Sequence, residues 1–403
     1  MKRLQAYKFQ LRPKDGQVTK MQRFAGCCRF VWNKALALEK ESFATTGKRL
    51  GYNTLAGLLT KWKQEPETSF LTEVHSQILQ QSLKDLDRGY VNFFQQRAKP
   101  PRFKKRGVHN SFRYPQGFKL DEKNSRIYLP KIGWVRYRNS RSIEGTPKQV
   151  TVSLYAGKWF VSVQTEREIE NPVHPSASVV GIDMGITNFV TMSDGTALAS
   201  VNSFRKHQRK LAKLQRSLSR KTKFSANWYK AKARISRIQK KITDVRKDFL
   251  HKATTPISKN HAIVVVEDLK VKNMSASASG NMDNPGHNVR AKSGLNKAIL
   301  DQGWYEFRRQ LGYKLAWQGG TLLVVPPQYT SQTCSQCDYI DRANRPTQAR
   351  FKCIACGFET NADHNAALNI LAAGQAVSAC GVEKALASTM KQEPTCRSLE
   401  RAI

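Results

Sequence analysis

The stretch Val179-Val180-Gly181-Ile182-Asp183-Met184-Gly185 predicts a buried β-strand that ends in a carboxylate and is followed by a turn. Apolar, mostly β-branched residues lead up to Asp183, and Gly185 allows the chain to reverse. The segment Phe189-Val190-Thr191-Met192 has the pattern of the returning strand of a hairpin. Within this stretch alone, Asp183 fits two roles equally well, an ordinary turn residue or a functional acid.

Two more acids occupy comparable positions. Ile263-Val264-Val265-Val266-Glu267 predicts a second buried strand that ends in a carboxylate, and Asp363 begins a helix predicted over residues 363–371. The ordinary role of Asp363 is that of a helix N-cap. Clustered carboxylates raise one another's pKa unless a cation neutralises them. Together with Asp183, the two acids therefore indicate a divalent-metal site. In a protein that binds nucleic acid, such a site serves phosphodiester cleavage, where two Mg2+ ions about 4 Å apart activate water and stabilise the leaving oxygen.

The charge of the chain indicates a polyanionic partner. Its 403 residues include 68 Lys+Arg and 30 Asp+Glu, a formal net charge of +38. A field of this size favours nucleic acid, because released counterions contribute much of the affinity. A membrane-surface protein fits less well, since the charge is spread along the chain. Without a signal peptide or an apolar stretch of about 20 residues, we expect a soluble, intracellular protein that does not act at a membrane.

Four of the eight cysteines form two C-x-x-C pairs. This spacing predicts a tetrahedral structural zinc site with no open coordination position, which holds the fold and takes no part in chemistry. The remaining thiols are interpreted as ordinary ones, with Cys27 and Cys28 on a buried helix face. The predicted zinc ligands are Cys334, Cys337, Cys353 and Cys356.

The N-terminal part combines helices with short strands. Alternating residues at 7–11 predict a strand, and apolar residues at helical spacing over 24–38 and 79–94 predict two helices with a polar loop near 51–54 between them. Residues 112–163 show short alternating segments typical of a small antiparallel barrel or sandwich, which the first strand joins. Residues 171–178 have the composition of a linker.

Several polar residues of this part are candidates for nucleic-acid contacts. The cationic stretch 99–106 is either a solvated linker or a phosphate-contact site, and the charge of the chain favours the second. Gln77 and Gln80 lie on the polar side of the second helix, where they are either solvated or meet base edges. The phosphate-contact candidates are Arg102, Lys104, Lys105 and Arg106.

Residues 205–248 contain 17 Lys/Arg and only two acids, Asp244 and Asp248, yet retain apolar residues at helical spacing. Two long helices, separated near residues 225–227, are the simplest interpretation. One face of each helix packs against the protein and the other meets phosphate. A further helix is predicted at 304–315 and a strand at 322–325.

Taken together, these motifs resemble the TnpB (OrfB) family, transposon-encoded proteins related to type V CRISPR effector nucleases. The resemblance extends from about residue 5 to residue 375, with the motifs in the order of the family. It departs from the family pattern at Asn361-Ala362, where many members have Asp and Arg, and at Asp338, where glycine is usual. The matching motifs are Gly181-Ile182-Asp183-Met184-Gly185, Val266-Glu267-Asp268-Leu269, the two C-x-x-C pairs, Asp363-His364-Asn365-Ala366-Ala367-Leu368-Asn369-Ile370, Phe30-Val31-Trp32-Asn33 and Pro101-Arg102-Phe103-Lys104.

The resemblance implies an RNA-guided, Mg2+-dependent DNA endonuclease with an α+β multidomain fold. Its partners would be a guide RNA derived from the transposon end and a target DNA, cut beside a short duplex motif. The resemblance also implies a cytoplasmic, prokaryotic protein that acts at the nucleoid. By position, Asp183, Glu267 and Asp363 match the catalytic metal-binding acids of the family. Tyr52 joins Gln77 and Gln80 as a residue placed to read the duplex motif.

The implied domains follow the same resemblance. They are a wedge β-barrel (1–19 and 99–172), a helical recognition insert (20–98), a RuvC-type, RNase H-like nuclease domain (176–330, with basic helices at 205–250), an inserted zinc ribbon (331–358), a final RuvC helix (359–375) and a disordered tail (376–403).

Two other functions are weighed against this one. A transposase that joins DNA ends itself normally has the acid order Asp, Asp, Glu, or else a tyrosine with two histidines one residue apart, and the sequence has neither. A non-catalytic regulator that uses a guide to occupy DNA predicts the loss of at least one acid, and all three are present.

Overall fold

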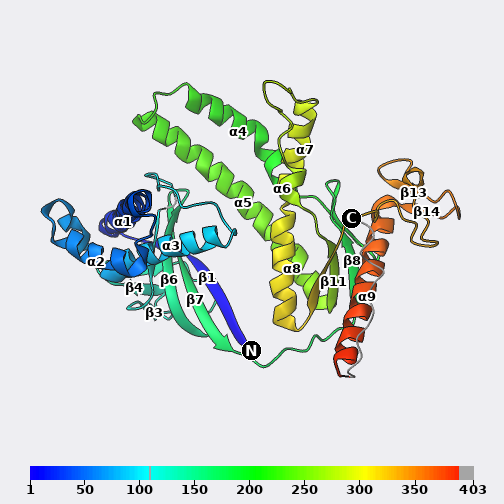
Figure 1. The fold of residues 1–403 in the computed structure, drawn as a ribbon, viewed down its shortest axis with the longest axis horizontal. Helices are drawn as coiled ribbons and strands as arrows, with labels where there is room; N and C mark the ends of the chain where they lie inside the picture. Colours follow the sequence, from blue (N-terminus) through cyan, green and yellow to red (C-terminus); the bar gives the residue numbers. More distant parts are fainter. Residues whose placement is uncertain (109, 390–403) are drawn as a thin grey trace. The chain divides into compact units, whose positions relative to one another are not determined.

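The computed structural model describes residues 1–108 and 110–389, and the chain divides between Glu170 and Asn171 into two compact units. Figure 1 shows their elements in sequence colours. The division falls at the start of the stretch predicted to be a linker.

The first unit contains a seven-stranded antiparallel sheet. Alternation places Tyr7, Phe9 and Leu11 of strand β1 (Lys2–Arg12) in its core, as predicted. The described residues include no pairing between β2 and β3, the two ends of the order, so closure into a barrel stays a prediction. The strand order is β2-β6-β7-β1-β5-β4-β3, with β2 Ser111–Tyr114, β3 Lys119–Asp121, β4 Arg126–Leu129, β5 Gly133–Tyr137, β6 Thr146–Tyr155 and β7 Lys158–Glu168.

Helices α1 (Asp15–Thr46) and α3 (Ser76–Phe94) confirm the two predicted helices of this unit, and Cys27 and Cys28 are buried on α1. The prediction of a loop near residues 51–54 is wrong. Helix α2 (Gly51–Gln64) begins there and is followed by the 3-10 helix η1 (Pro66–Glu73). The polar stretch forms the first turn of α2. Leu55, Leu59 and Trp62, which follow it, form a buried face, and the packing of this face stabilises the whole helix.

The second unit is built on a five-stranded sheet. Strand β8 (Val179–Asp183) pairs antiparallel with β9 (Asn188–Met192) and parallel with β11 (Ile263–Glu267), which pairs parallel with β12 (Thr321–Val325). Strand β10 (Ala197–Ala199) completes the order β10-β9-β8-β11-β12. Ile182 pairs with Val266, so Asp183 and Glu267 come next on adjacent parallel strands, at the same edge of the sheet.

Helices cover both faces of this sheet, which explains the uninterrupted apolar runs of its central strands. Val264 and Val266 pack in a core with Phe307 of α8 (Trp304–Gln318), whereas Val265 packs with Ile370 of α9 (Ala362–Thr389) on the other face. The predicted basic helices are α4 (Ser203–Ser219) and α5 (Ala226–Asn260), which lie side by side in Figure 1. Two shorter helices are α6 (Val271–Met274) and α7 (Val289–Gln302).

Helix α9 continues past residue 375, where the sequence predicts its end, so the prediction that a tail begins at 376 is wrong. Gly374, which lies just before that point, does not end the helix and instead allows close packing. A Cβ at Gly374 would lie 2.3 Å from a side-chain atom of Val265, so the missing side chain lets α9 approach β11. Residues 390–403 of the predicted tail lie outside the described residues.

A second glycine allows the same approach on β8. A Cβ at Gly181 would lie 2.3 Å from the carbonyl oxygen of Ala367 and 2.6 Å from the backbone nitrogen of Leu371. Backbone atoms cannot rotate away as a side chain can. The close packing of α9 on the sheet therefore depends on Gly181, and this packing sets the position of Asp363 at the start of α9.

We expect Gly181→Val to destabilise the protein by about 3 kcal/mol or more, because the added methyl groups force α9 away from β8. The measurement is chemical denaturation followed by circular dichroism. The matched control is Gly294→Ala in α7, where a Cβ meets no atom within 4 Å. That change should raise stability by up to about 1 kcal/mol through helix propensity. Equal stability of Gly181→Val and the native protein would contradict the packing argument.

Candidate active site

The side chains of Asp183 and Glu267 lie on the same face of the sheet. Residues two apart in a strand share a face, and Gly181 and Val265, two residues before each acid, both meet α9. Asp183 is largely buried, and this burial, with the charges of Glu267 and Asp363, raises its pKa to about 7. Both partner acids therefore act electrostatically on Asp183.

Asp363 is free from its ordinary role as a helix cap. The Asn361 side chain accepts hydrogen bonds from the backbone nitrogens of Asp363 (2.9 Å) and His364 (3.3 Å), which is the work of an N-cap. The Asp363 carboxylate is left facing a cavity of about 480 Å3 that Asp183 also lines. Arg345 lies 3.7 Å from Asp363 and lowers the pKa of Asp183, so one cation is already close to the acids.

The three acids line two neighbouring cavities and do not form a compact group of ligands. Glu267 lines an adjacent cavity of about 350 Å3, which shares Met184 and Trp304 with the first. Among the described residues, only the four cysteines form a group of three or more possible ligands whose atoms all lie within 4.8 Å. The donor set is nevertheless all carboxylate oxygen, which suits Mg2+.

A polar network that the sequence analysis missed orients Glu267. Thr330 donates a 2.6 Å hydrogen bond to its carboxylate, which limits the rise in the pKa of Glu267 caused by burial. Asn369 of α9 donates to the carbonyl oxygens of Thr330 (2.8 Å) and Thr333 (2.7 Å). Asn365, one turn earlier, donates to the same Thr333 carbonyl. The i, i+4 spacing of the two asparagines was visible in the sequence, but their partner loop was not.

The four predicted zinc ligands do come together. The Sγ atoms of Cys334 and Cys356 are 3.7 Å apart, and those of Cys337 and Cys353 are 3.6 Å apart. A tetrahedral site with Zn–S bonds of about 2.3 Å needs S–S separations of about 3.8 Å, so the cluster fits zinc. The cysteines lie beside η2 (Arg342–Asn344) and the hairpin of β13 (Arg350–Lys352) and β14 (Glu359–Asn361).

The two turns of this cluster also account for a departure from the family pattern. Asp338 follows the second cysteine with φ = +56°, and Gly357 follows the fourth with φ = +75°. Both residues are left-handed, a conformation that favours glycine and that aspartate tolerates better than most residues. Asp338 therefore supports the same turn at some cost in strain.

Comparison with known proteins gives a close relative. Over 395 residues, the chain is 58% identical to the Escherichia coli (strain K12) protein named "Putative RNA-guided DNA endonuclease InsQ", covering 98% of each chain. The chain belongs to the TnpB (OrfB) family. A Streptomyces pristinaespiralis relative of this family, named "Putative RNA-guided DNA endonuclease", is 36% identical over 96% of each chain.

Three family descriptions match separate segments of this TnpB-family chain. Residues 160–278 match "Probable transposase" (OrfB_IS605), and residues 304–370 match "Cas12f1-like, TNB domain". Residues 1–48 match "Helix-turn-helix domain", although in the structure they are strand β1 and helix α1.

The fold is similar to a solved structure described as "Cryo-EM structure of the Cas12f1-sgRNA-target DNA complex". The TM-score is 0.56 at 15% identity, over 89% of this chain and 83% of that chain. At this identity the similarity concerns the fold alone.

The predicted nucleic-acid contacts of the first unit differ in accessibility. Arg102, Lys105 and Arg106 are exposed. Lys104 is held in the fold: its Nζ lies 3.6 Å from the centroid of the Trp32 ring, and burial lowers the pKa of its ammonium group. Lys104 is therefore the weakest candidate of the cationic stretch.

The residues predicted to read bases also differ in how exposed their side chains are. Gln80 is exposed on α3. Gln77 is half-buried, and its buried Oε1 has no hydrogen-bond partner among the described residues. Tyr52 packs against the core of the first unit, with Lys84 Nζ 5.3 Å from its ring centroid.

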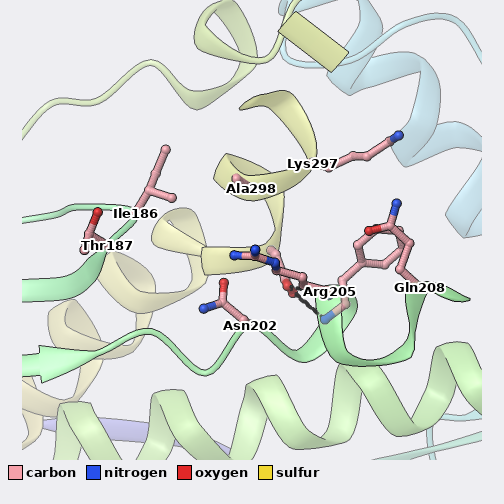
Figure 2. Close-up of a pocket in the computed structure, with 9 residues that line it drawn as sticks. Ile186, Thr187, Asn202, Arg205, Gln208, Lys297 and Ala298 are labelled. Carbon is pink, nitrogen blue, oxygen red and sulfur yellow. Dashed lines mark hydrogen bonds between the residues drawn. The ribbon is translucent and has the colours of Figure 1, made fainter. Parts of the chain in front are cut away.

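A third cavity of the second unit has a volume of about 410 Å3 and is lined by residues that include Asn202, Arg205 and Lys297 (Figure 2). It shares Ile186 and Thr187 with the cavity of Asp183. Buried Asp301 of α7 also lines this cavity and accepts hydrogen bonds from the first turn of α4 and from Arg246 of α5 (2.8 Å). This carboxylate ties three helices together, and the sequence analysis missed it.

In the described part of the chain, no helix is long and apolar enough to cross a membrane.

The raised pKa of Asp183 predicts a pH dependence that Mg2+ removes. A carboxyl group with a folded-state pKa of about 7 and an unfolded value of 3.8 binds its proton more tightly when folded. In metal-free protein, its contribution to stability is present below the unfolded pKa and is lost as the pH rises towards 7. A divalent ion binds the carboxylate form, so Mg2+ should raise Tm more at about pH 7.5 than at about pH 5. Asp183→Asn should lack this difference, and an equal Mg2+ effect at both pH values would contradict the assignment.

Proposed function

We propose that this chain is a transposon-encoded, RNA-guided DNA endonuclease that cleaves its target beside a short duplex motif. The observation that carries the proposal is the 58% identity to a relative of that name over 98% of each chain. The partners would be a guide RNA derived from the transposon end and a target DNA. The net charge of +38 supports partners of this kind.

The proposed catalytic groups are Asp183, Glu267 and Asp363, which would hold two Mg2+ ions. Support comes from the position of Asp183 and Glu267 at one edge of the sheet and from the cavity that Asp183 shares with Asp363. The pKa of Asp183 is raised by burial and further by the charges of the other two acids, and bound cations would offset this repulsion. When bound, such ions activate a water molecule and stabilise the leaving oxygen of the phosphodiester. The chain itself orients Glu267 through Thr330 and places Arg345 beside Asp363.

The proposed zinc ion would be held by the four cysteines in a structural role. Their Sγ distances support this, and none of the three acids belongs to the cluster. Loss of this ion should therefore act on stability first and on chemistry only through Arg345 and the loop that carries Thr330.

The domain assignment remains part of the proposal. The order β10-β9-β8-β11-β12, with one antiparallel hairpin and parallel strands beyond it, supports a RuvC-type nuclease domain over 176–330 completed by α9. Residues 331–358 would be its zinc ribbon. Residues 1–19 and 99–172 would form the wedge domain, and 20–98 the recognition insert, with Arg102, Lys105, Arg106 and Gln80 as their accessible nucleic-acid contacts.

The test is to purify the protein from its native host and sequence the RNA that accompanies it. A discrete RNA, encoded beside the gene and ending in neighbouring genomic sequence, would support the proposal. DNA matching that end should then be cut in the presence of Mg2+. Unrelated RNA at a salt concentration that removes weak binders would contradict guidance and leave an unguided nuclease or a transposase.

A further inference from the structure

Three aromatic side chains gather where α4 and α5 are joined. The Phe224 and Trp228 ring centroids are 5.5 Å apart, and those of Trp228 and Tyr229 are 5.2 Å apart. Phe224 is 63% exposed and Tyr229 is 54% exposed. Rings of this size normally contribute by burial, yet these two leave more than half of their surface in water.

Phe224 is also held in an unfavourable conformation. Its φ is +69°, the left-handed region that glycine adopts easily and that a bulky side chain avoids. The turn around it is well defined, because Ser225 caps α5 by accepting a 3.2 Å hydrogen bond from the Trp228 backbone nitrogen. Strain of this kind persists where the side chain has a use that compensates for it. Burial is not that use, since the ring is exposed.

The surroundings of the rings indicate what they would bind. Lys223 Nζ lies 5.3 Å from the Phe224 ring centroid, and Lys232 Nζ lies 4.9 Å from that of Trp228. The two helices carry 17 Lys/Arg against two acids between residues 205 and 248. Cations beside exposed aromatic faces complement a ligand with negative charge and flat apolar rings, which is the chemistry of a nucleic acid with unstacked bases.

We propose that the aromatic tip, residues Phe224, Trp228 and Tyr229, stacks an unpaired base of a single-stranded nucleic acid, with Lys223 and Lys232 beside the adjoining phosphates. The inference rests on the proposed function only in taking a nucleic acid as the partner. It adds a site for unpaired bases, distant in sequence from all three catalytic acids. Fully paired duplex offers its bases at its ends alone and should bind the tip poorly.

The decisive variant is Phe224→Gly in the full-length protein. Glycine relieves the left-handed strain, so the thermal stability should stay equal or rise. The same change removes the stacking ring, so the Kd for a short single-stranded oligonucleotide should rise about 5- to 150-fold, which corresponds to roughly 1–3 kcal/mol. A merely structural role predicts no change in Kd. Phe224→Trp keeps an aromatic ring at this position and should retain tight binding.

The control is Ala156→Gly, which relieves the left-handed strain at φ = +49° in the turn between β6 and β7 without removing a ring. Its Kd should equal that of the native protein. The probes are oligo(U), oligo(dT) and a blunt DNA hairpin, each at a salt concentration that screens non-specific phosphate contacts. An effect on oligo(U) alone would identify an RNA base, and an effect on oligo(dT) alone a DNA base.

Oligonucleotides that carry 5-iodouracil locate the contact independently. Irradiation should cross-link the probe to the peptide that spans residues 224–229. Cross-links elsewhere, together with an unchanged Kd for Phe224→Gly, would overturn the proposal. Guided cleavage by the native protein is measured on the same preparations, so a failure of the proposed nuclease activity is distinguishable from a failure of the aromatic tip.

Discussion

Replacing Asp183 with alanine is expected to lower the rate of guided DNA cleavage by roughly a thousandfold or more, while RNA binding stays nearly unchanged. Asp183 ends the central strand β8, and its pKa is raised by burial and by the charges of Glu267 and Asp363, so it interacts with both other acids of the proposed site. Loss of this ligand removes several kcal/mol of transition-state stabilisation, and each 1.4 kcal/mol is about tenfold in rate. A carboxylate has the same sign of charge as a phosphate, so its removal should take away no contact on which RNA affinity depends.

The matched control is Asp194→Ala. Asp194 lies in the turn between β9 and β10 of the same sheet, accepts a 2.8 Å hydrogen bond from the Thr196 backbone nitrogen, and lines a different cavity. Its replacement should cost stability slightly and leave cleavage intact. Single-turnover assays measure the cleavage rate, and filter binding of labelled RNA measures RNA affinity separately. Cleavage that survives Asp183→Ala in the presence of Mg2+ would refute the assignment of the site.

Replacing Cys353 with serine is expected to remove the metal ion and unfold residues 331–358. A structural zinc site contributes on the order of 10 kcal/mol to a small domain, and a cluster of three thiolates and a hydroxyl binds zinc far more weakly. Soluble yield and zinc content should fall first. Cleavage should then fall because Arg345 and the loop of Thr330 lose their support.

Cys27→Ala provides the control, since Cys27 is a buried thiol of α1 outside the cluster. It should lose some core packing but keep a full zinc content. Metal analysis of the purified variants, with thermal unfolding in the presence and absence of a chelator, measures both effects. A native zinc content in Cys353→Ser would contradict the four-cysteine site.

Local patterns in the sequence accounted for much of this protein. The strands that end in Asp183 and Glu267, the helix that begins near Asp363 and the two basic helices are all where periodicity predicts them. Local patterns were misleading where contacts with distant residues decide the conformation of a segment. Polar residues at 51–54 suggested a loop although they begin α2, and the helix expected to end at 375 continues to Thr389, with Gly374 fitting against Val265.

The sequence by itself determined which residues could do chemistry, because spacing along a strand, a helix or a C-x-x-C turn is a property of neighbours in the chain. The tertiary structure decided which of them meet. Asp363 is 180 residues from Asp183, and it reaches the same cavity because Gly181 lets α9 pack against β8 while Asn361 takes over the helix cap. Such contacts depend on close packing between distant segments, and no local pattern records them.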